Sequence, residues 1–348
     1  MSSPFRRLLV VVSALVLVAA IAGIGYAQTP PSRVPQWTKA APFPMPEEEL
    51  YGSVVNGKFY VLGGFGMGGM APGLVFEYDP ATDRWTRKKD MPVKVHHQAQ
   101  TPLNGKLYVF GGCLQAISGE GGTTNAWEWD PVADSWRALA PLTVKRCSAV
   151  AEQVDGKIYL IGGLEPMENG KGTRVSGRNQ MYDPATNTWT ERSPMPTTRN
   201  HAMAGAVNGK IYVLGGRLGA GNIPVTTNVD TVEEYDPATN LWGAVKERMP
   251  QVRSGGGWAT CNGKIYVGGG EWITREFYAA LRALDAYDPA TNTWETLTPL
   301  PGAVHGNAMG CIGNKLHTAS GKMRAGGGPD PATASHDVLE LPQRGGTQ

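Results

Sequence analysis

The sequence predicts an all-β protein, a six-bladed β-propeller whose last blade is closed by an N-terminal strand around Trp37. Three repeated features lead to this prediction. A Gly-Gly pair occurs five times at a spacing of about 50 residues, an aromatic-Asp-Pro turn follows each pair, and a tryptophan lies six residues after each Asp. A repeat of this length is typical of a four-stranded propeller blade. The tryptophans are Trp85, Trp136, Trp189, Trp242 and Trp294.

Each repeat divides into four strands. Short runs of β-branched and aromatic residues, such as 58–62 and 210–214, predict strands. An Asn-Gly or Asp-Gly turn precedes each run, and this dipeptide indicates a hairpin because both residues tolerate positive φ. The Asp-Pro turn forms the second hairpin, since Asp can bond the amides ahead of it and Pro fixes the next φ. The paired glycines indicate an unusual φ or a close backbone approach.

The sixth blade is assembled from both ends of the chain. Residues 313–321 resemble the second strand of a repeat, with Ser320 in the first glycine position, and 336–340 resemble the third strand. No tryptophan strand follows them, but Trp37 precedes Trp85 by about one repeat period. We therefore expect the strand around Trp37 to complete blade six and to remove the open edges. A closed ring has no edge that demands a partner, so we expect a monomer.

The N-terminus predicts export. Arg6 and Arg7 precede an apolar stretch over 8–24, and small residues come before Gln28. This pattern is typical of a signal peptide over residues 1–27, which leaves the propeller as residues 28–348. The same stretch approaches the roughly 20 residues that span a bilayer, so an uncleaved anchor that tethers the chain to a membrane is the alternative. Both cases give a periplasmic or extracellular propeller.

Composition and cysteine spacing exclude several classes of function. The formal net charge is +2, without a basic run, so nucleic acid is not an expected partner. The four cysteines fall in different repeats without a Cys-x-x-Cys pair, which argues against a zinc site or a redox dithiol. An exported chain can form disulfides, but the favoured interpretation is that the four cysteines are buried free thiols. The cysteines are Cys113, Cys147, Cys261 and Cys311.

The repeated motifs resemble the kelch-repeat superfamily over nearly all of the mature length. The resemblance implies a propeller but leaves the function broad. Members of the superfamily include protein-interaction propellers, a copper radical oxidase, iron-dependent plant specifier proteins and exported bacterial sialic acid mutarotases.

Polar residues are expected to gather around the propeller axis. The position seven residues before the turn of each first strand holds Glu49, His97, Ser148, His201, Gly255 and Asn307, and two residues earlier stand Glu47, Val95, Arg146, Arg199, Arg253 and His305. The last member of each row is open by one residue, because Gly313-Asn314 reverses the order of the turn dipeptide. Arginines bind carboxylates bidentately, so this set predicts a channel mouth that binds an anionic ligand. A channel that binds only water is the alternative. The expected ligand contacts are Arg146, Arg199, Arg253, Arg217, His97, His201 and His305.

The residues that follow the glycine pairs suggest a second kind of site. They are Phe65, Cys113, Leu164, Arg217 and Glu271. The segment from Glu271 to Arg275 is similar to one in the sialic acid mutarotases, although the spacing is shorter and the repeats are more regular here. The resemblance implies that Glu271 is an acid/base and Arg275 a carboxylate clamp for sugar ring opening. The alternative is an ion pair on a surface loop.

Metal chemistry is disfavoured. His97, His201 and His305 could join Glu49 as ligands, but they come from alternate blades and would meet only in a narrow channel. The Tyr-His pair of the copper oxidase and the ligand spacing of the iron-dependent proteins are absent. We therefore predict no metal and no cofactor.

Two functions remain. The favoured one is a binding module for a protein, an acidic glycan or an acidic small molecule. The other is a mutarotase or epimerase that acts on an anionic sugar such as sialic acid.

Overall fold

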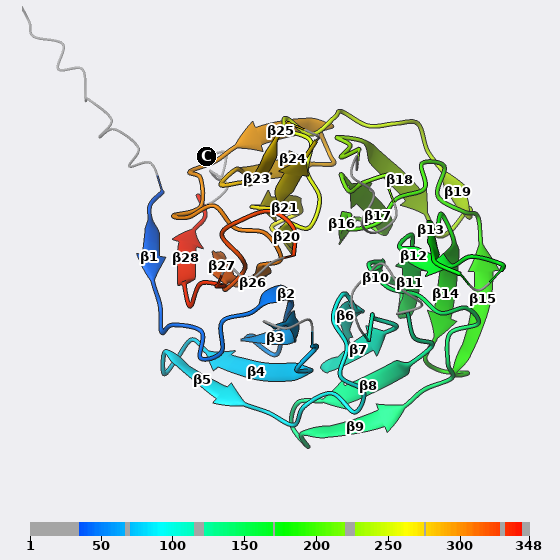
Figure 1. Ribbon diagram of the computed structural model, residues 1–348, viewed down its shortest axis with the longest axis horizontal. Helices are drawn as coiled ribbons and strands as arrows, with labels where there is room; N and C mark the ends of the chain where they lie inside the picture. The colour runs from blue at the N-terminus through cyan, green and yellow to red at the C-terminus, as the bar shows by residue number, and fades with distance from the viewer. Residues whose placement is uncertain are drawn as a thin grey trace, which may run out of the picture. The chain divides into compact units, whose positions relative to one another are not determined.

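The computed structural model describes residues 35–66, 70–114, 122–169, 171–219, 227–274, 276–327 and 331–342. Within these ranges all regular structure is β: six four-stranded sheets form the blades of a ring around a central axis, and two short hairpins extend from it (Figure 1). The predicted six-bladed propeller is confirmed. No helix of the described chain has the length and apolarity to cross a membrane. The predicted leader over 1–27 and the apolar stretch over 8–24 lie outside the described residues.

In blades one to three the four strands lie in chain order from the axis outward. Blade one has β2 (Glu48–Val55), β3 (Lys58–Phe65), β4 (Leu74–Asp79) and β5 (Arg84–Arg87). Blade two has β6 (Ala99–Leu103), β7 (Lys106–Phe110), β8 (Ala126–Asp130) and β9 (Ser135–Ala138). Blade three has β10 (Val150–Val154), β11 (Lys157–Ile161), β14 (Asn179–Asp183) and β15 (Thr188–Arg192), with the hairpin β12 (Leu164–Pro166) and β13 (Thr173–Val175) between its second and third strands.

Blades four to six comprise the remaining strands. Blade four has β16 (Met203–Val207), β17 (Lys210–Leu214), β18 (Val232–Asp236) and β19 (Leu241–Trp242). Blade five has β20 (Gly257–Cys261), β21 (Lys264–Gly268), β24 (Leu284–Asp288) and β25 (Thr293–Thr296), with the hairpin β22 (Glu271–Ile273) and β23 (Tyr278–Ala280). Blade six has β26 (Ala308–Ile312), β27 (Lys315–Ala319), β28 (His336–Glu340) and β1 (Trp37–Lys39).

The N-terminal strand closes the ring as predicted. β1 pairs antiparallel with β28, and Trp37 faces Leu339 across the ladder. The backbone amide of Ala40 continues this pairing with a 3.0 Å hydrogen bond to the carbonyl of His336. The third strand of blade six is therefore paired on both sides, and strands from the two ends of the described chain share one sheet.

The repeated tryptophan joins each blade to the one before it. In blade three the indole nitrogen of Trp189 donates a 2.9 Å hydrogen bond to the carbonyl of Ala140, which lies in the segment that leaves blade two. The five other blades make the same contact with donor–acceptor distances of 2.9 to 3.2 Å. This bond requires an aromatic ring with a donor, which explains why tryptophan returns in every copy.

The second glycine of each pair is required by the backbone. Gly64 has φ of 98° and its equivalents have φ of 92° to 100°, a region that residues with a Cβ rarely enter. The first position of the sixth copy is Ser320, with φ of 58°, while Gly321 keeps φ of 98°. The left-handed region near 58° is open to a non-glycine residue at a modest cost. This explains why only the first glycine of the pair is replaced.

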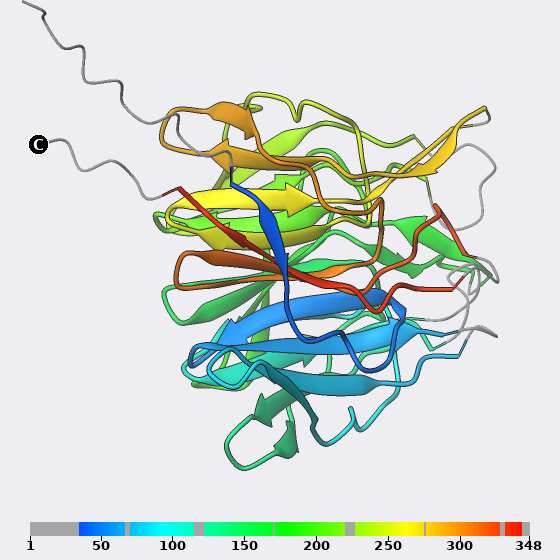
Figure 2. The same cartoon turned by 90° about the vertical axis from the view of Figure 1, so that its left-hand side faces the viewer.

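The ring has two different faces. The inner strands begin, and the second strands end, at the face that we call the mouth face. Because neighbouring strands are antiparallel, the Asn-Gly and Asp-Pro turns lie at the opposite end, which we call the turn face (Figure 2).

The four cysteines form two disulfides between neighbouring blades. Cys113 is bonded to Cys147, and Cys261 to Cys311. The favoured interpretation of free buried thiols is therefore wrong. The sequence left the pairing open because cysteines 34 and 50 residues apart meet only when adjacent blades pack side by side.

Candidate binding site at the channel mouth

The mouth is built from one backbone arrangement that is repeated around the axis. In each blade the residue after the glycine pair forms a bridge or ladder pair with a residue just before the inner strand or at its start. The pairs are Phe65 with Glu48, Cys113 with His96, Leu164 with Cys147, Arg217 with Asn200, Glu271 with Ser254, and Lys322 with His305. The side chains therefore differ from blade to blade on a constant frame, which is how a repeat scaffold builds a specific site.

The sequence placed the sixth blade one residue out of register. Gly306, not Asn307, occupies the axial position, since its carbonyl accepts a 3.0 Å hydrogen bond from Leu50 and its φ is 60°. The first turn residue of this blade is Gly313 instead of Asn314, because β26 ends at Ile312. His305 therefore belongs to the row of residues that pair with the loops, not to the arginine row.

Four polar side chains occupy the axial position in a strained conformation. Glu49, His97, Ser148 and His201 have φ between 51° and 57°, in the left-handed region, whereas blades five and six have glycine there. A non-glycine residue in this region costs about 1 kcal/mol or more. These side chains therefore occupy the axis at an energetic cost that glycine would avoid.

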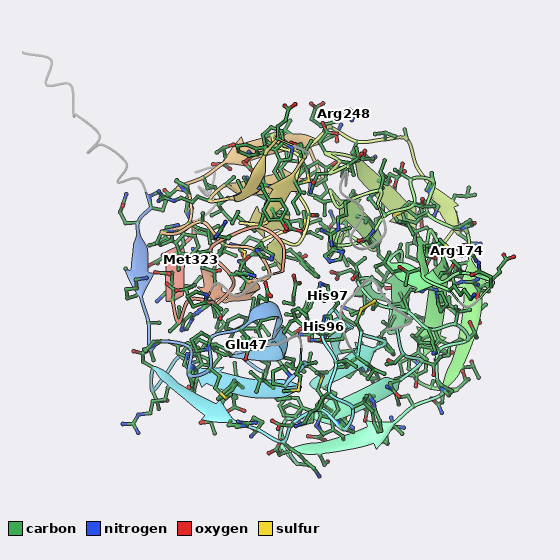
Figure 3. All side chains as sticks on the ribbon, viewed as in Figure 1. Glu47, His96, His97, Arg174, Arg248 and Met323 are labelled. Atoms are coloured by element: carbon green, nitrogen blue, oxygen red, sulfur yellow. A yellow bond between two sulfur atoms is a disulfide. The ribbon has the colours of Figure 1, made fainter. Side chains whose placement is uncertain are left out.

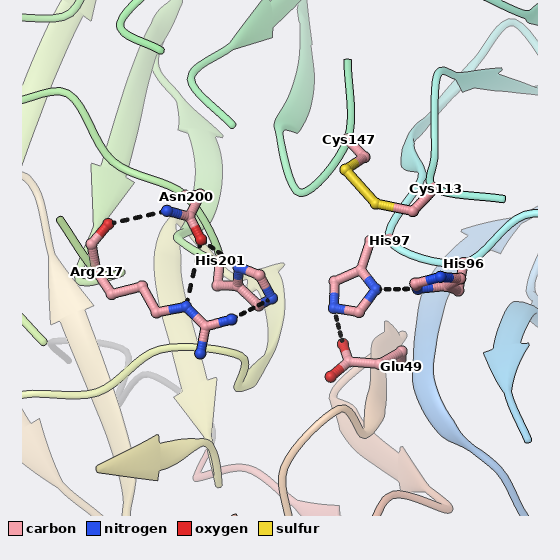
Figure 4. The surroundings of a disulfide bond; sticks show 8 residues. All are labelled: Glu49, His96, His97, Cys113, Cys147, Asn200, His201 and Arg217. Atoms are coloured by element: carbon pink, nitrogen blue, oxygen red, sulfur yellow. Dashed lines mark hydrogen bonds and ion pairs between the residues drawn. A yellow bond between two sulfur atoms is a disulfide. The ribbon is translucent and has the colours of Figure 1, made fainter. Parts of the chain in front are cut away.

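Arg217 connects two blades at the mouth. Its guanidinium contacts Glu271 Oε1 at 2.7 Å. Figure 4 shows its other two contacts: the guanidinium lies 2.8 Å from His201 Nε2, and Nε donates to Asn200 Oδ1 at 3.3 Å. Burial, followed by the charge of Arg217, holds the pKa of His201 well below its ordinary value, so the ring is neutral. The neutral ring nitrogen can then accept from Arg217.

Glu49 and His97 form a second polar contact on the other side of the axis. His97 Nε2 lies 3.1 Å from Glu49 Oε2, and the other ring nitrogen of His97 contacts His96 (Figure 4). Burial alone would raise the pKa of Glu49, but the contacts with His97 and then His305 hold it at about 2. The neighbouring carboxyl behaves in the opposite way. Burial and the charge of Glu49 raise the pKa of Glu48 to about 8.

The channel is narrow enough for residues of alternate blades to meet. The rings of His97 and His201 have centroids 4.7 Å apart. A cavity of about 10 Å³ lies beside His201 and is also lined by Glu49 and Ser148 among others, which leaves room for about one water molecule. His97 and His201 come from alternate blades, and the channel is narrow enough for their rings to meet.

The arginine row does not line this mouth. The guanidinium of Arg199 is paired with Glu233, and that of Arg253 with Asp285; both side chains are fully buried. Arg146 is also buried and donates to the carbonyl of Gly162 at 2.9 Å. These contacts favour a structural role inside the blades, in place of the expected contacts with an anionic ligand.

Glu271, the acid/base residue that the resemblance implies, lies at the mouth, and both of its carboxylate oxygens have partners within the protein. Glu271 is 2% exposed; Arg217 and the hydroxyl of Ser254 contact its Oε1, and the amide of Gly326 donates to its Oε2 at 2.8 Å. Glu271 is therefore not the surface-loop carboxylate of the alternative interpretation. Arg275 lies outside the described residues.

Sequence reasoning missed Glu48, His96, Asn200 and Lys322. Lys322 could have been found because it follows Ser320-Gly321, the degenerate copy of the glycine pair. Glu48, His96 and Asn200 each lie one residue before a member of the axial row that begins with Glu49. Their spacing in the sequence does not distinguish them from the residues on either side.

Comparison with known proteins agrees with this architecture. A family model described as the KLHDC2/KLHL20/DRC7 Kelch-repeats domain matches residues 97–321, and the Kelch motif matches residues 52–92. The chain belongs to the kelch-repeat family. Kelch propellers commonly bind other proteins, and loops at the end of such a scaffold are where binding residues concentrate.

Similar kelch proteins come from a fungus and from an animal. Kelch-like protein terF of Aspergillus terreus is 34% identical over 187 residues, which cover 51% of this chain and 39% of that protein. Alpha-scruin of Limulus polyphemus is 28% identical over 218 residues, or 62% of this chain and 22% of that protein. Each match takes up less than half of the relative's length. A solved structure titled "Structure of YjhT" shares the fold with a TM-score of 0.68 and 18% identity, covering 86% of this chain and 96% of that one.

Exposed apolar side chains surround the mouth of this kelch propeller. All six blades contribute at least one, from the segment between the second and third strands, and their exposed fractions lie between 42% and 74%. In Figure 3, Met323 belongs to this set, while His96 and His97 lie nearer the axis. We call the set the apolar rim; it consists of Met70, Leu114, Met167, Leu218, Phe277, Tyr278 and Met323.

Proposed function

We propose that this kelch propeller is an exported binding module that docks a partner protein on its mouth face. The apolar rim is the observation that supports the proposal. Large apolar side chains on loops of six blades form no core of their own, and clustered exposed apolar residues are typical of protein-binding surfaces.

Export is supported by the cysteines as well as by the predicted leader. Disulfides persist in oxidising compartments and are rare in the cytosol. The two disulfides of the ring, Cys113–Cys147 and Cys261–Cys311, therefore suit a periplasmic or extracellular protein. A fractionation experiment that finds the chain in the cytosol with four free thiols would contradict this part of the proposal.

The binding proposal can be tested with peptides. Peptides selected from a displayed random library on the purified propeller would be titrated calorimetrically against the wild type, Phe277→Ser and Met323→Ser. We expect each rim substitution to weaken binding at least tenfold, about 1.4 kcal/mol.

Matched controls use apolar side chains that are exposed elsewhere. Val132 is 86% exposed and lies in the turn between the third and fourth strands of blade two, and Leu241 is 62% exposed and begins the fourth strand of blade four. Val132→Ser and Leu241→Ser should bind like the wild type. Equal losses in the rim and control variants, or no selected peptide at all, would reject the rim as the docking surface.

The sugar mutarotase remains a second candidate because Arg217 and Glu271 lie side by side at the mouth. A guanidinium beside a carboxylate could hold an acidic sugar and exchange protons with it. Saturation-transfer NMR with N-acetylneuraminic acid would detect binding, and exchange between its anomers would be followed in the same sample. Faster exchange that is lost in Glu271→Gln would favour the enzyme, whereas unchanged exchange would reject it.

A further inference from the structure

Three potential metal ligands converge at the centre of the mouth. His305 Nε2 lies 3.5 Å from Glu48 Oε2 and 3.7 Å from Glu49 Oε1, and the ligand atoms of these three residues all lie within 4.8 Å of one another. All three side chains are buried. Ligands held about 2.0–2.2 Å from one ion are roughly 3 to 4 Å apart, so the spacing suits a single cation.

One carboxylate oxygen aimed into this cluster has no direct hydrogen-bond donor. Among the described residues Glu48 Oε2 has no hydrogen-bond partner, although its side chain is only 9% exposed. The nearest cation is the ammonium of Lys322, 3.5 Å away, which is longer than a direct hydrogen bond. Burying a carboxyl oxygen without a hydrogen-bond partner is costly, and a bound cation would supply a partner.

A neighbouring histidine orients one of the ligands. His97 Nε2 holds Glu49 Oε2 at 3.1 Å and leaves Oε1 facing His305. Metal-binding carboxylates are commonly fixed by such an outer contact. The strained backbone of Glu49, with φ of 57°, is the means by which the side chain reaches the axis.

We propose that Glu48, Glu49 and His305 bind one divalent first-row transition-metal ion. Two carboxylates favour Mn²⁺ and the imidazole favours Zn²⁺, so these two ions are the expected ligands. Glu48 and Lys322 also line a cavity of about 590 Å³ beside Phe65, which provides an entry path. The bound ion would compete with the ammonium of Lys322 for Glu48 Oε2.

The test uses the untagged full chain after chelator treatment. Equilibrium dialysis followed by elemental analysis should find one Zn²⁺ or Mn²⁺ per chain, and calorimetry gives the affinity. We expect Glu48→Gln and His305→Gln each to weaken binding at least a hundredfold. Co²⁺ should give visible absorption bands in the wild type that both variants lose.

Two further variants make the result specific. Lys322→Met removes the competing cation and should tighten binding about tenfold. His317→Gln alters a buried histidine on β27 outside the three proposed ligands and should leave the affinity unchanged. Circular dichroism shows which variants fold. Binding of less than one ion per chain, or equal affinity in the folded Glu48→Gln or His305→Gln variant and the wild type, would overturn the proposal.

Discussion

Replacing Arg199 with methionine should strongly destabilise the propeller. The guanidinium is paired with Glu233 and donates to the carbonyls of Val213 at 2.9 Å and Thr197 at 3.1 Å. The substitution keeps most of the side-chain volume but leaves the carboxylate of Glu233, 3% exposed, without its counter-ion. Breaking a buried ion pair in this way costs about 3–5 kcal/mol. For a unit of about 300 residues, this lowers Tm by roughly 5–8 °C.

A matched control exists in the same blade. Arg248 pairs with Asp230 at 2.5 Å, but its side chain is 64% exposed, and Figure 3 shows it at the outer edge of the ring. Arg248→Met should therefore cost no more than about 1 kcal/mol. The double variant Arg199→Met/Glu233→Leu should recover part of the loss, since it removes both buried charges.

Urea unfolding followed by circular dichroism gives the comparison. If Arg199→Met and Arg248→Met agree within 1 kcal/mol, the structural role of the arginine row is refuted. Loss of ligand binding in Arg199→Met at unchanged stability would instead support the ligand contact that the sequence suggested.

Three further predictions concern the frame of the ring. Replacing both Cys113 and Cys147 with alanine should cost about 4 kcal/mol of unfolding free energy, the loop-entropy value for a 34-residue separation, and non-reducing peptide mapping should show the bond directly. Burial, and then the charge of His336, lower the pKa of His317 to about 3. The neutral form of His317 contributes fully to the unfolding free energy above pH 6.5, and this contribution is lost as pH falls towards 3. In urea unfolding, the wild type should therefore lose roughly 3–5 kcal/mol more than His317→Leu over this pH range. Trp189→Phe removes one hydrogen bond to the preceding blade and should cost about 1–2 kcal/mol in the same assay, whereas no loss would contradict the role given to the indole nitrogen.

The fold could be predicted because its signals are local and repeated. A turn dipeptide, a glycine with φ near 100° and a tryptophan that bonds to the preceding blade each act over a few residues, and the repeat confirms each signal several times. The closing strand around Trp37 followed from the same counting. One shifted turn, at Gly313, was enough to move His305 into the wrong row.

The site was harder to predict because neighbouring residues of an extended chain point in different directions. Arg253 extends into its blade towards Asp285, while the adjacent Ser254 faces Glu271 at the mouth. Sequence spacing does not decide which of the two directions faces the axis. Cysteine pairing also depends on which blades are neighbours, a relation that no single repeat contains.

The way the ring is closed also determines how the protein can be handled. Pro35 accepts a 2.7 Å hydrogen bond from Thr298, and Leu341 donates a 2.9 Å bond to the first-to-second-strand turn at Asn314. The first and last described segments therefore both lie at the turn face (Figure 2). A propeller immobilised on a sensor through either of these segments would present the mouth to the solution. Binding measured in the two orientations should agree, which gives surface assays of this protein an internal check.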